Sequence, residues 1–479
     1  MSRIDQKMPG YAFVDLEKGQ FAGSKREDLT RFFQGLSRNN ANDLVVHFHG
    51  GLVGREAAHT SARRLSKTYD AAGVGSLFFV WNTDLGTTLK KNLLAIAREA
   101  VFWTVVSRVR SLVMWAGLDI PVAVAGIRGS RRPPLVLPPN ETAEEVRRKA
   151  KQPDPVIAPR KLTAQEEMEA LQALERDGSL QRRFAELAPA TQGDRGARAA
   201  VRKPTLMSPE LLAQAYPRSA RGARAGPITI FLLRRVVAAA GAVIKRYLTK
   251  THHGLYPTVV EEVLSAFYAA NVGRGIWSAM KANAVHAFEG SPRSHAGAAF
   301  VADLIKWWAP GKKVTLVGHS AGSIFIVELM QRLIAAHPSF RASCVLLAPA
   351  CTFERFATAL PDLRKGLTAL RIFNLSDELE RGYWEVPVLY SASLLYLVSG
   401  ILENNPDTAL IGMQRYYSGE KPYTTPQIAS VRKFLEPALN WAPAKIAPAR
   451  LCNATKHGGF DQDAATLMSL ASIVKDGIR

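Results

Sequence analysis

The sequence predicts an α/β fold in which helices cover both faces of a doubly wound, mostly parallel sheet. Short apolar runs, rich in β-branched and aromatic residues, alternate with longer segments typical of helices, both early and late in the chain. Such alternation indicates strand–helix–strand units, whose strands pair in parallel. Between these two parts lies a long basic segment in which the alternation stops, and this segment predicts a large, mainly helical insertion.

Two early apolar runs supply the first strands. Asp43–His49 (DLVVHFH) ends at Gly50-Gly51, which indicates a buried strand followed by a tight turn. Ser76–Trp81 (SLFFVW) is a second run of the same kind. Arg55–Ala72 lies between them and is polar enough for a surface helix. The three segments predict one strand–helix–strand unit.

The same alternation returns late in the chain. Three apolar runs there predict strands, and a fourth, weaker run follows them. Helices are predicted before, between and after these runs. The strands are expected at Lys313–Val317, Ser343–Leu347, Leu370–Asn374 and, more weakly, Arg450–Ala454, and the helices at Ala296–Trp308, Ser323–Ala336 and from about Asp463.

The segment between these parts divides the chain. We assign residues 1–84 and 291–479 to the α/β core and residues 85–290 to a basic, mainly helical insertion. Asn92–Arg110 and Phe231–Tyr247 have the composition of cationic, apolar helices. Residues 128–225 are rich in Pro, Arg and Ala, and we expect them to be partly mobile. Two capping boxes within this stretch, Thr142–Glu145 and Thr163–Glu166, predict the start of charged helices.

One motif carries chemistry. The predicted strand Lys313–Val317 runs into Gly318-His319-Ser320-Ala321-Gly322, and an apolar helix follows. In this G-x-S-x-G arrangement the serine sits on a strained turn, and the flanking glycines let strand and helix approach closely. The turn pushes the Ser320 hydroxyl out of the sheet and places the Ala321 N–H where a developing oxyanion can bind. The alternative is a Gly–Ser turn without chemistry.

With this motif and its neighbouring strands, the chain resembles the α/β-hydrolase superfamily, specifically its serine esterases and lipases. The resemblance covers about residues 43–84 and 296–479 and does not extend to the insertion. It implies an α/β-hydrolase fold with the insertion placed before the nucleophile strand. It also implies that Ser320 is the nucleophile and that an oxyanion loop, an acid and a histidine accompany it.

The implied oxyanion loop is His49-Gly50-Gly51, which looks like the H-G-G loops of lipases and esterases. Backbone N–H groups of such loops point at the acyl oxygen. Because Leu52 follows where a third glycine would be usual, the N–H that acts together with that of Ala321 could belong to Gly50, Gly51 or Leu52. The alternative is an ordinary Gly–Gly turn.

The implied acid is Asp377, which follows the predicted strand Leu370–Asn374. A carboxylate there can hold the imidazole in one tautomer and stabilise the imidazolium. Glu378, Glu380 and Asp407 remain alternatives, and Asp377 could instead be a helix N-cap.

The implied histidine is His457, because Gly458-Gly459 lets the chain bend there and because the order Ser320, Asp377, His457 is the order of the superfamily. His47, His49 and His319 come too early. His252-His253 could be mistaken for a metal pair, but no carboxylate or cysteine lies at ligand spacing, and we interpret it as a polar turn.

These residues predict a serine hydrolase that cleaves carboxylic esters through an acyl-enzyme, as a lipase, phospholipase or carboxylesterase does. The alternatives are a thioesterase, acyltransferase or peptidase with the same triad, and a non-catalytic membrane-associated interaction protein. No metal or organic cofactor is required. Three cysteines, Cys344, Cys351 and Cys452, form no C-x-x-C pair, which argues against a disulfide framework or a structural zinc site.

The basic composition of the chain indicates which partners it could bind. Lys and Arg total 62 and Asp and Glu 41, for a net charge of +21. This charge favours anionic surroundings, but no aromatic residues interleave the basic runs as in nucleic-acid-binding proteins. The insertion helices carry Arg98, Arg108, Arg110, Arg234, Arg235, Lys245 and Arg246 together with Phe102, Trp103, Trp115 and Phe231. This combination suits an anionic membrane surface, although helices packed on the core would have the same composition.

The chain also predicts a location. Its first residues, MSRIDQKMPGYAF, do not resemble a signal peptide. Charged residues interrupt the most apolar stretches, Ala100–Val106, Ser111–Ile127 and Pro227–Val243, so that no transmembrane helix is expected. We therefore expect a cytoplasmic protein, peripheral at a membrane if the insertion binds one.

Overall fold

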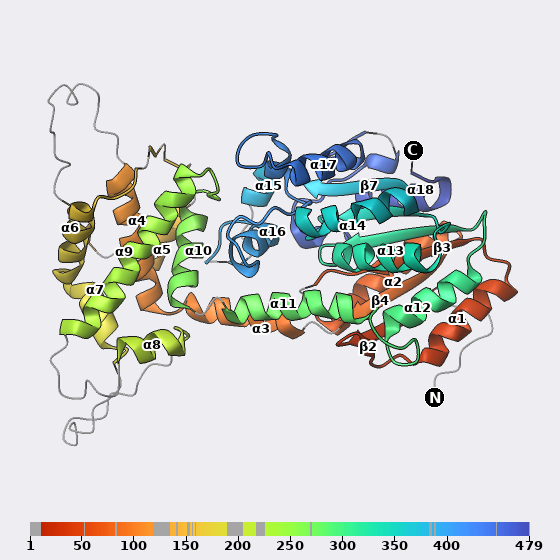
Figure 1. The fold of residues 1–479 in the computed structure, drawn as a ribbon, viewed down its shortest axis with the longest axis horizontal. Coiled ribbons are helices and arrows are strands. Elements are labelled where there is room, and N and C mark those ends of the chain that lie inside the picture. Colours follow the sequence, from red (N-terminus) through yellow and green to blue (C-terminus); the bar gives the residue numbers. More distant parts are fainter. Residues whose placement is uncertain are drawn as a thin grey trace, which may run out of the picture.

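The computed structural model shows an α/β protein built around one eight-stranded sheet (Figure 1). It describes residues 11–478 except 52, 82–83, 118–134, 140–141, 151–153, 156, 159, 189–204, 217–225, 269–270, 383–385, 388 and 447. The strand order is β2-β1-β4-β3-β5-β6-β7-β8, and every neighbouring pair is parallel except β1 with β2. The predicted α/β class with a mostly parallel sheet is therefore confirmed.

Five of the strands match the apolar runs seen in the sequence. They are β3 (Asp43–Phe48), β4 (Gly75–Trp81), β5 (Lys313–His319), β6 (Ala342–Leu347) and β7 (Leu367–Leu375). These strands are buried on both faces, which is why they are continuously apolar rather than alternating.

The remaining strands were not predicted. Two of them are short strands at the edges of the sheet, and the third lies next to one edge. They are β1 (Tyr11–Glu17), β2 (Gln20–Phe21) and β8 (Leu439–Ala442). The predicted strand at Arg450–Ala454 is wrong, since Cys452 there forms only an isolated bridge with Ala444. The true last strand, LNWA, has too few residues to stand out.

Helices cover both faces of the sheet (Figure 1). One face carries α1 (Arg26–Arg38), α12 (Ala296–Trp307), α13 (Gly322–Ala336) and α14 (Phe353–Gly366). The other carries α2 (Arg55–Ala71) and α18 (Ala464–Asp476). Aromatic rings fill the layer between the sheet and α13: Phe325 stacks on Trp81 at 4.2 Å and on Phe48 at 5.8 Å between ring centroids. This packing sets the position of α13 relative to the strands beneath it.

The helices between β4 and β5 extend away from the sheet. Figure 1 shows α4 to α10 gathered in a separate helical lobe, with α3 and α11 running side by side between this lobe and the sheet. The helices are α3 (Asp84–Ile96), α4 (Ala100–Gly117), α5 (Ala143–Ala150), α6 (Ala164–Glu175), α7 (Gly178–Ala185), α8 (Pro209–Ala215), α9 (Gly226–Leu248), α10 (Leu255–Phe267) and α11 (Asn271–His286).

Both predicted capping boxes are present, and Thr163 accepts from the backbone N–H of Glu166 at the start of α6. The single helix expected over Asn92–Arg110 is wrong, because the chain forms two helices there, α3 and α4. Of residues 128–225, which were predicted to be partly mobile, 128–134, 140–141, 151–153, 156, 159, 189–204 and 217–225 lie outside the described residues.

A second helical segment, which the sequence analysis did not separate from the core, lies between β7 and β8. It contains α15 (Asp377–Gly382), α16 (Leu394–Leu397), the π-helix Val398–Leu402, the 3₁₀ turn Gln414–Tyr417, α17 (Pro426–Leu435) and the 3₁₀ turn Glu436–Ala438. We call it the β7–β8 segment. In Figure 1, α15 and α16 lie between the sheet and the helical lobe.

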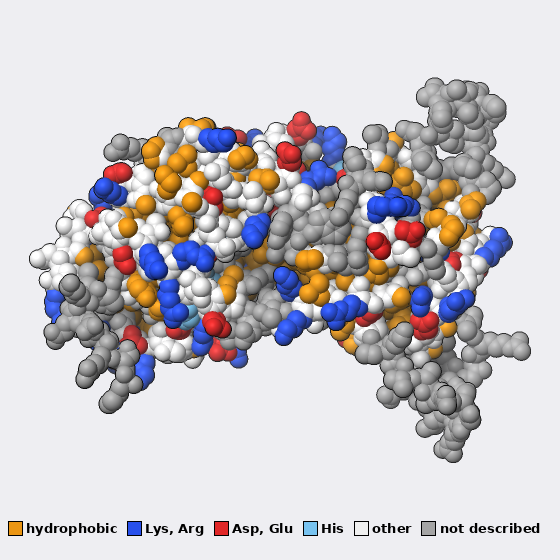
Figure 2. All heavy atoms as spheres, turned by 180° about the vertical axis from the view of Figure 1, so that it is seen from behind, with side chains coloured by type: hydrophobic (Ala, Val, Ile, Leu, Met, Phe, Trp, Pro, Cys, Tyr) orange, Lys and Arg blue, Asp and Glu red, His pale blue; other side chains and the backbone are white. Residues whose placement is uncertain are grey.

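The surface view shows Lys and Arg side chains scattered over the face drawn, interspersed with acidic and apolar ones (Figure 2). Within the described part of the chain, none of the helices has the length and apolar character that crossing a membrane requires. All three cysteines are buried, free thiols.

Candidate active site

Ser320 lies on a tight turn between β5 and α13. Its φ angle is 51°, in the left-handed region that residues other than glycine rarely adopt. The surrounding chain holds this conformation: the Ser320 N–H donates to the Leu347 carbonyl at 2.8 Å, and its own carbonyl accepts from the Ala350 N–H at 3.0 Å. Both partners belong to the chain at the end of β6. A backbone conformation that is costly alone is thus imposed by tertiary contacts.

Both glycines of the motif are required by close packing. A Cβ added to Gly322 would overlap the backbone carbonyl of Phe48 on β3. One added to Gly318 would lie 2.7 Å from Cδ1 of Ile326 and 3.0 Å from the carbonyl carbon of Gly322. Strand and helix therefore approach as closely as the G-x-S-x-G pattern predicts.

The predicted oxyanion loop lies directly against the serine. A Cβ added to Gly50 would be 3.5 Å from Cβ of Ser320, and one added to Gly51 would be 2.7 Å from Cβ of Ala321. Among the described residues, the backbone N–H groups of Gly50, Gly51 and Ala321 have no hydrogen-bond acceptor. Leu52 lies outside the described residues. Free N–H groups beside a serine hydroxyl are what an oxyanion hole requires.

His49 orients this loop. Its Nε2 accepts from the Trp81 N–H at 3.1 Å, so its Nδ1 carries the proton and donates to the Gly50 carbonyl at 2.5 Å. Burial lowers the pKa of His49 to about 4, which keeps the ring neutral. Because C=O and N–H point in opposite directions across a trans peptide, the Gly51 N–H is turned away from His49. This orientation favours Gly51 as the second donor.

His457 lies against His319, the residue before the serine. Its backbone carbonyl accepts from Nε2 of His319 at 2.9 Å, and the two rings are 5.4 Å apart. Its side chain is buried, and neither ring nitrogen has a hydrogen-bond partner among the described residues. Burial, reinforced by His319, lowers the pKa of His457 well below its usual value, so the ring is held in its neutral form.

The acid candidates occupy different surroundings. Asp377 is half-buried at the start of α15, and its Oδ1 accepts from the Tyr396 hydroxyl at 2.5 Å. Glu380 is buried and accepts from the Ser393 hydroxyl, Asp407 is paired with His253, and Glu378 is exposed. Asp377, Glu380 and Asp407 thus each have a hydrogen-bond partner while Glu378 faces solvent, and the choice of Asp377 stays a prediction.

The structure places Ser320 against the oxyanion loop and His457 against His319, but it does not join the three triad candidates by hydrogen bonds, since neither ring nitrogen of His457 has a partner among the described residues. β7 is two strands from β5, so Asp377 leaves the sheet about 10 Å from the elbow. Catalytic hydrogen bonds are often long or absent without substrate. From the insertion, Met280 of α11 covers the site, because its side chain fills the space beside Gly51.

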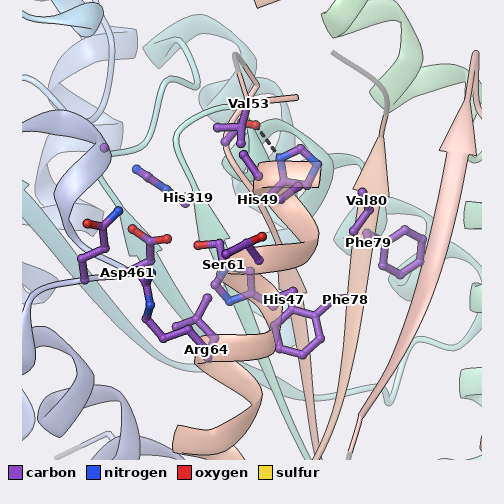
Figure 3. A pocket seen from close by; sticks show the side chains of 18 of the residues that line it. His47, His49, Val53, Ser61, Arg64, Phe78, Phe79, Val80, His319 and Asp461 are labelled. Carbon is purple, nitrogen blue, oxygen red and sulfur yellow. Dashed lines mark hydrogen bonds between the residues drawn. The ribbon is translucent and has the colours of Figure 1, made fainter. Parts of the chain in front are cut away.

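A cavity of about 500 Å³ borders the site on the side of α2. Figure 3 shows His319 and Asp461 on one side of it and His47, His49 and Ser61 on the other. Gly50 and Leu347, both in contact with Ser320, line it as well. The sequence analysis did not single out Asp461, although it lies only four residues after His457. Its charge acts on His319, the neighbour of the serine.

The pair His252-His253 is not an ordinary polar turn. His253 is buried and lies between two carboxylates, with Nδ1 2.8 Å from Glu261 and Nε2 3.0 Å from Asp407. Arg246 pairs with Glu261 at 2.5 Å, and Arg415 with Asp407 at 3.4 Å. We call these five residues the charge network. Sequence spacing missed it because Asp407 is 154 residues from His253. No metal-binding group of His, Cys, Asp or Glu occurs among the described residues.

Most of the aromatic side chains expected at a membrane surface are buried instead. Phe102, Trp103 and Trp115 pack inside the helical lobe, where neighbouring helices cover them. Arg108 is also buried and donates to Asp177. Arg246 is buried in the charge network. The alternative interpretation, that the helices pack together, therefore accounts for these residues. They no longer support a membrane partner.

Comparison of the chain with protein-family models, with curated proteins and with solved structures gives no match. The geometry of the site is therefore the ground on which its function is inferred.

Proposed function

We propose that the protein is a serine hydrolase of the α/β-hydrolase type that cleaves carboxylic esters through an acyl-enzyme on Ser320. One observation carries the proposal: Ser320 is held at φ 51° between β5 and α13, and nearby lie the N–H groups of Gly50, Gly51 and Ala321, which have no acceptor among the described residues. A purely structural turn has no reason to keep a serine in a strained conformation beside three free donors.

The proposed reaction follows from these positions. The neutral imidazole of His457 takes the proton of Ser320 as its oxygen attacks the ester carbonyl. The N–H groups of Ala321 and Gly51 stabilise the oxyanion, and His457 then protonates the leaving alcohol. Water then attacks the acyl-enzyme with His457 again as base. This step releases the carboxylic acid product and regenerates the hydroxyl of Ser320. Asp377 stabilises the imidazolium once the two side chains meet.

The proposed substrate is an ester with an apolar acyl chain. The cavity beside Gly50 and His319 has apolar walls from Phe78, Phe79 and Val80, which suits the acyl chain of an ester. The same acyl-enzyme would form from a thioester or an amide, so a thioesterase, acyltransferase or peptidase remains the alternative chemistry.

A fluorophosphonate probe tests the proposal, because it reacts with activated serines. We expect labelling of the native protein, loss of labelling in Ser320→Ala and retention in Ser343→Ala. Ser343 is a matched control, since it lies on the adjacent strand and its hydroxyl bonds to Thr315. Hydrolysis of p-nitrophenyl esters of increasing length should depend on Ser320 in the same way. A folded native protein that neither labels nor hydrolyses any ester would contradict the proposal.

A further inference from the structure

We propose that Tyr396 is a positioning residue for catalysis, which holds the carboxylate of Asp377 in place through its hydroxyl. This inference rests on the proposed function, since it concerns the acid of the same site. Tyr396 lies on α16, between the sheet and the helical lobe (Figure 1), and it was not among the residues expected to act.

Among the described residues, the hydroxyl of Tyr396 has a single hydrogen-bond partner. The ring is fully buried, and the hydroxyl donates to Oδ1 of Asp377 at 2.5 Å. Burial and the Asp377 carboxylate both raise the pKa of Tyr396 well above its usual value, so it stays a donor at any working pH. A carboxylate has about four lone-pair sites on its two oxygens. Asp377 can therefore keep this bond and also accept from an imidazole.

The backbone of Asp377 is fixed as well. Its N–H donates to Oε1 of Gln414 at 2.8 Å, and Gln414 belongs to the same β7–β8 segment as Tyr396. Two contacts from one segment thus orient the acid, one at its main chain and one at its carboxylate. A catalytic acid needs such support, because a displacement of about 1 Å can reduce a rate about 10²-fold.

Tyr396 is itself held by the charge network. Its ring lies edge-on to His253, 4.8 Å between centroids, and the Arg415 guanidinium lies 5.9 Å from the ring centre. His253 in turn is fixed by Glu261 and Asp407. Contacts therefore run without a break from α10 of the helical lobe to the proposed acid. The role we assign to the charge network is to fix the ring whose hydroxyl holds Asp377.

The test removes one oxygen atom. Tyr396→Phe deletes the hydroxyl and keeps the ring against His253 and Arg415. We expect kcat for a p-nitrophenyl ester to fall by about 10- to 100-fold with KM within about twofold of the native value. The control is Tyr417→Phe, which removes another hydroxyl of the β7–β8 segment, one bonded to the Ile411 carbonyl and not to Asp377 or the charge network. It should leave kcat within about twofold, and thermal unfolding should show both variants folded.

A double-mutant cycle separates positioning from general disturbance. If Tyr396 acts through Asp377, then adding Tyr396→Phe to Asp377→Ala should not lower the rate of Ser320 labelling further. Equal losses in both backgrounds, or a Tyr396→Phe variant as active as the native protein, would overturn the role of Tyr396 while leaving the hydrolase intact. Failure of the native protein to label at Ser320 would instead overturn the proposed function, and the catalytic role of Tyr396 with it.

Discussion

Two buried polar regions of this molecule differ in how their polar groups are satisfied. In the charge network, His253 bonds to two carboxylates and Asp407 accepts from His253, Tyr416 and Tyr423. At the carboxyl ends of the strands, by contrast, the ring nitrogens of His457 and the side-chain amide of Asn374 have no partner among the described residues, although both are buried.

The difference separates two uses of a buried polar group. A buried donor or acceptor without a partner costs about 1–3 kcal/mol, so proteins retain few of them. We expect an unpartnered polar group to be retained near a strained serine when its partner is a substrate or a reaction intermediate. The polar groups of the charge network already bond to one another rather than to a ligand, and the network supports the structure around the site. Each region should therefore respond differently when a polar group is removed.

The largest effect is expected at His457. Replacing it with leucine should reduce esterase activity by at least about 10³-fold, because the general base is lost. The free energy of unfolding should stay the same or rise, since an unpartnered polar ring is exchanged for an apolar side chain of similar size. Urea titration and ester hydrolysis measure the two quantities on one preparation. A strongly destabilised variant would show that His457 has structural partners after all.

The next effect concerns the charge network. Glu261→Ala should lower the free energy of unfolding by about 3–5 kcal/mol, because it leaves Arg246 and His253 buried without their common partner. The Glu261 carboxylate also packs against Gly400, so truncating Glu261 leaves a cavity there. Glu262→Ala is the matched control, because Glu262 is one residue along the same helix and its one ion pair within the described part of the chain is with Arg246, at 3.2 Å. Equal destabilisation by both variants would contradict the special place of Glu261.

A smaller effect should appear with pH. Burial lowers the pKa of His47 to about 3, against an ordinary value of 6.5. The folded state therefore excludes a proton that the unfolded state binds, and the stability linked to His47 is complete above pH 6.5 and lost as pH falls toward 3. The slope is about 1.4 kcal/mol per pH unit for one such histidine.

His47→Gln should flatten this part of the curve, because glutamine does not titrate and can still bond to the hydroxyl of Tyr69, which lies 3.2 Å from Nδ1 of His47. Urea midpoints at pH 7, 6, 5 and 4 measure the slope. Glu261 contributes at lower pH, since its pKa is held at about 2 against 4.5, and that part should persist in the variant. An unchanged slope between pH 6.5 and 4 would rule out His47 as its source.

Much of the α/β core was open to prediction from local pattern. The strands at Asp43–Phe48 and Lys313–His319 are continuous apolar runs, and the glycines beside Ser320 mark a turn that no bulkier residue fits. These features depend on a few adjacent residues, so the order of amino acids is enough to reveal them. For the same reason Ser320, Gly50 and Gly51 could be named before their positions were known, and the structure brings them together.

Other features depend on residues far apart in the chain. The charge network joins His253 to Asp407, and the partner of Asp377 is Tyr396 from a segment that the sequence analysis left undivided. Burial of Trp103 and Trp115 likewise depends on which helices pack against α4. A sequence shows which side chains can form hydrogen bonds or pack in a core. Their actual partners depend on which distant segments the fold brings together, because a buried polar group can bond only to a complementary group that lies beside it.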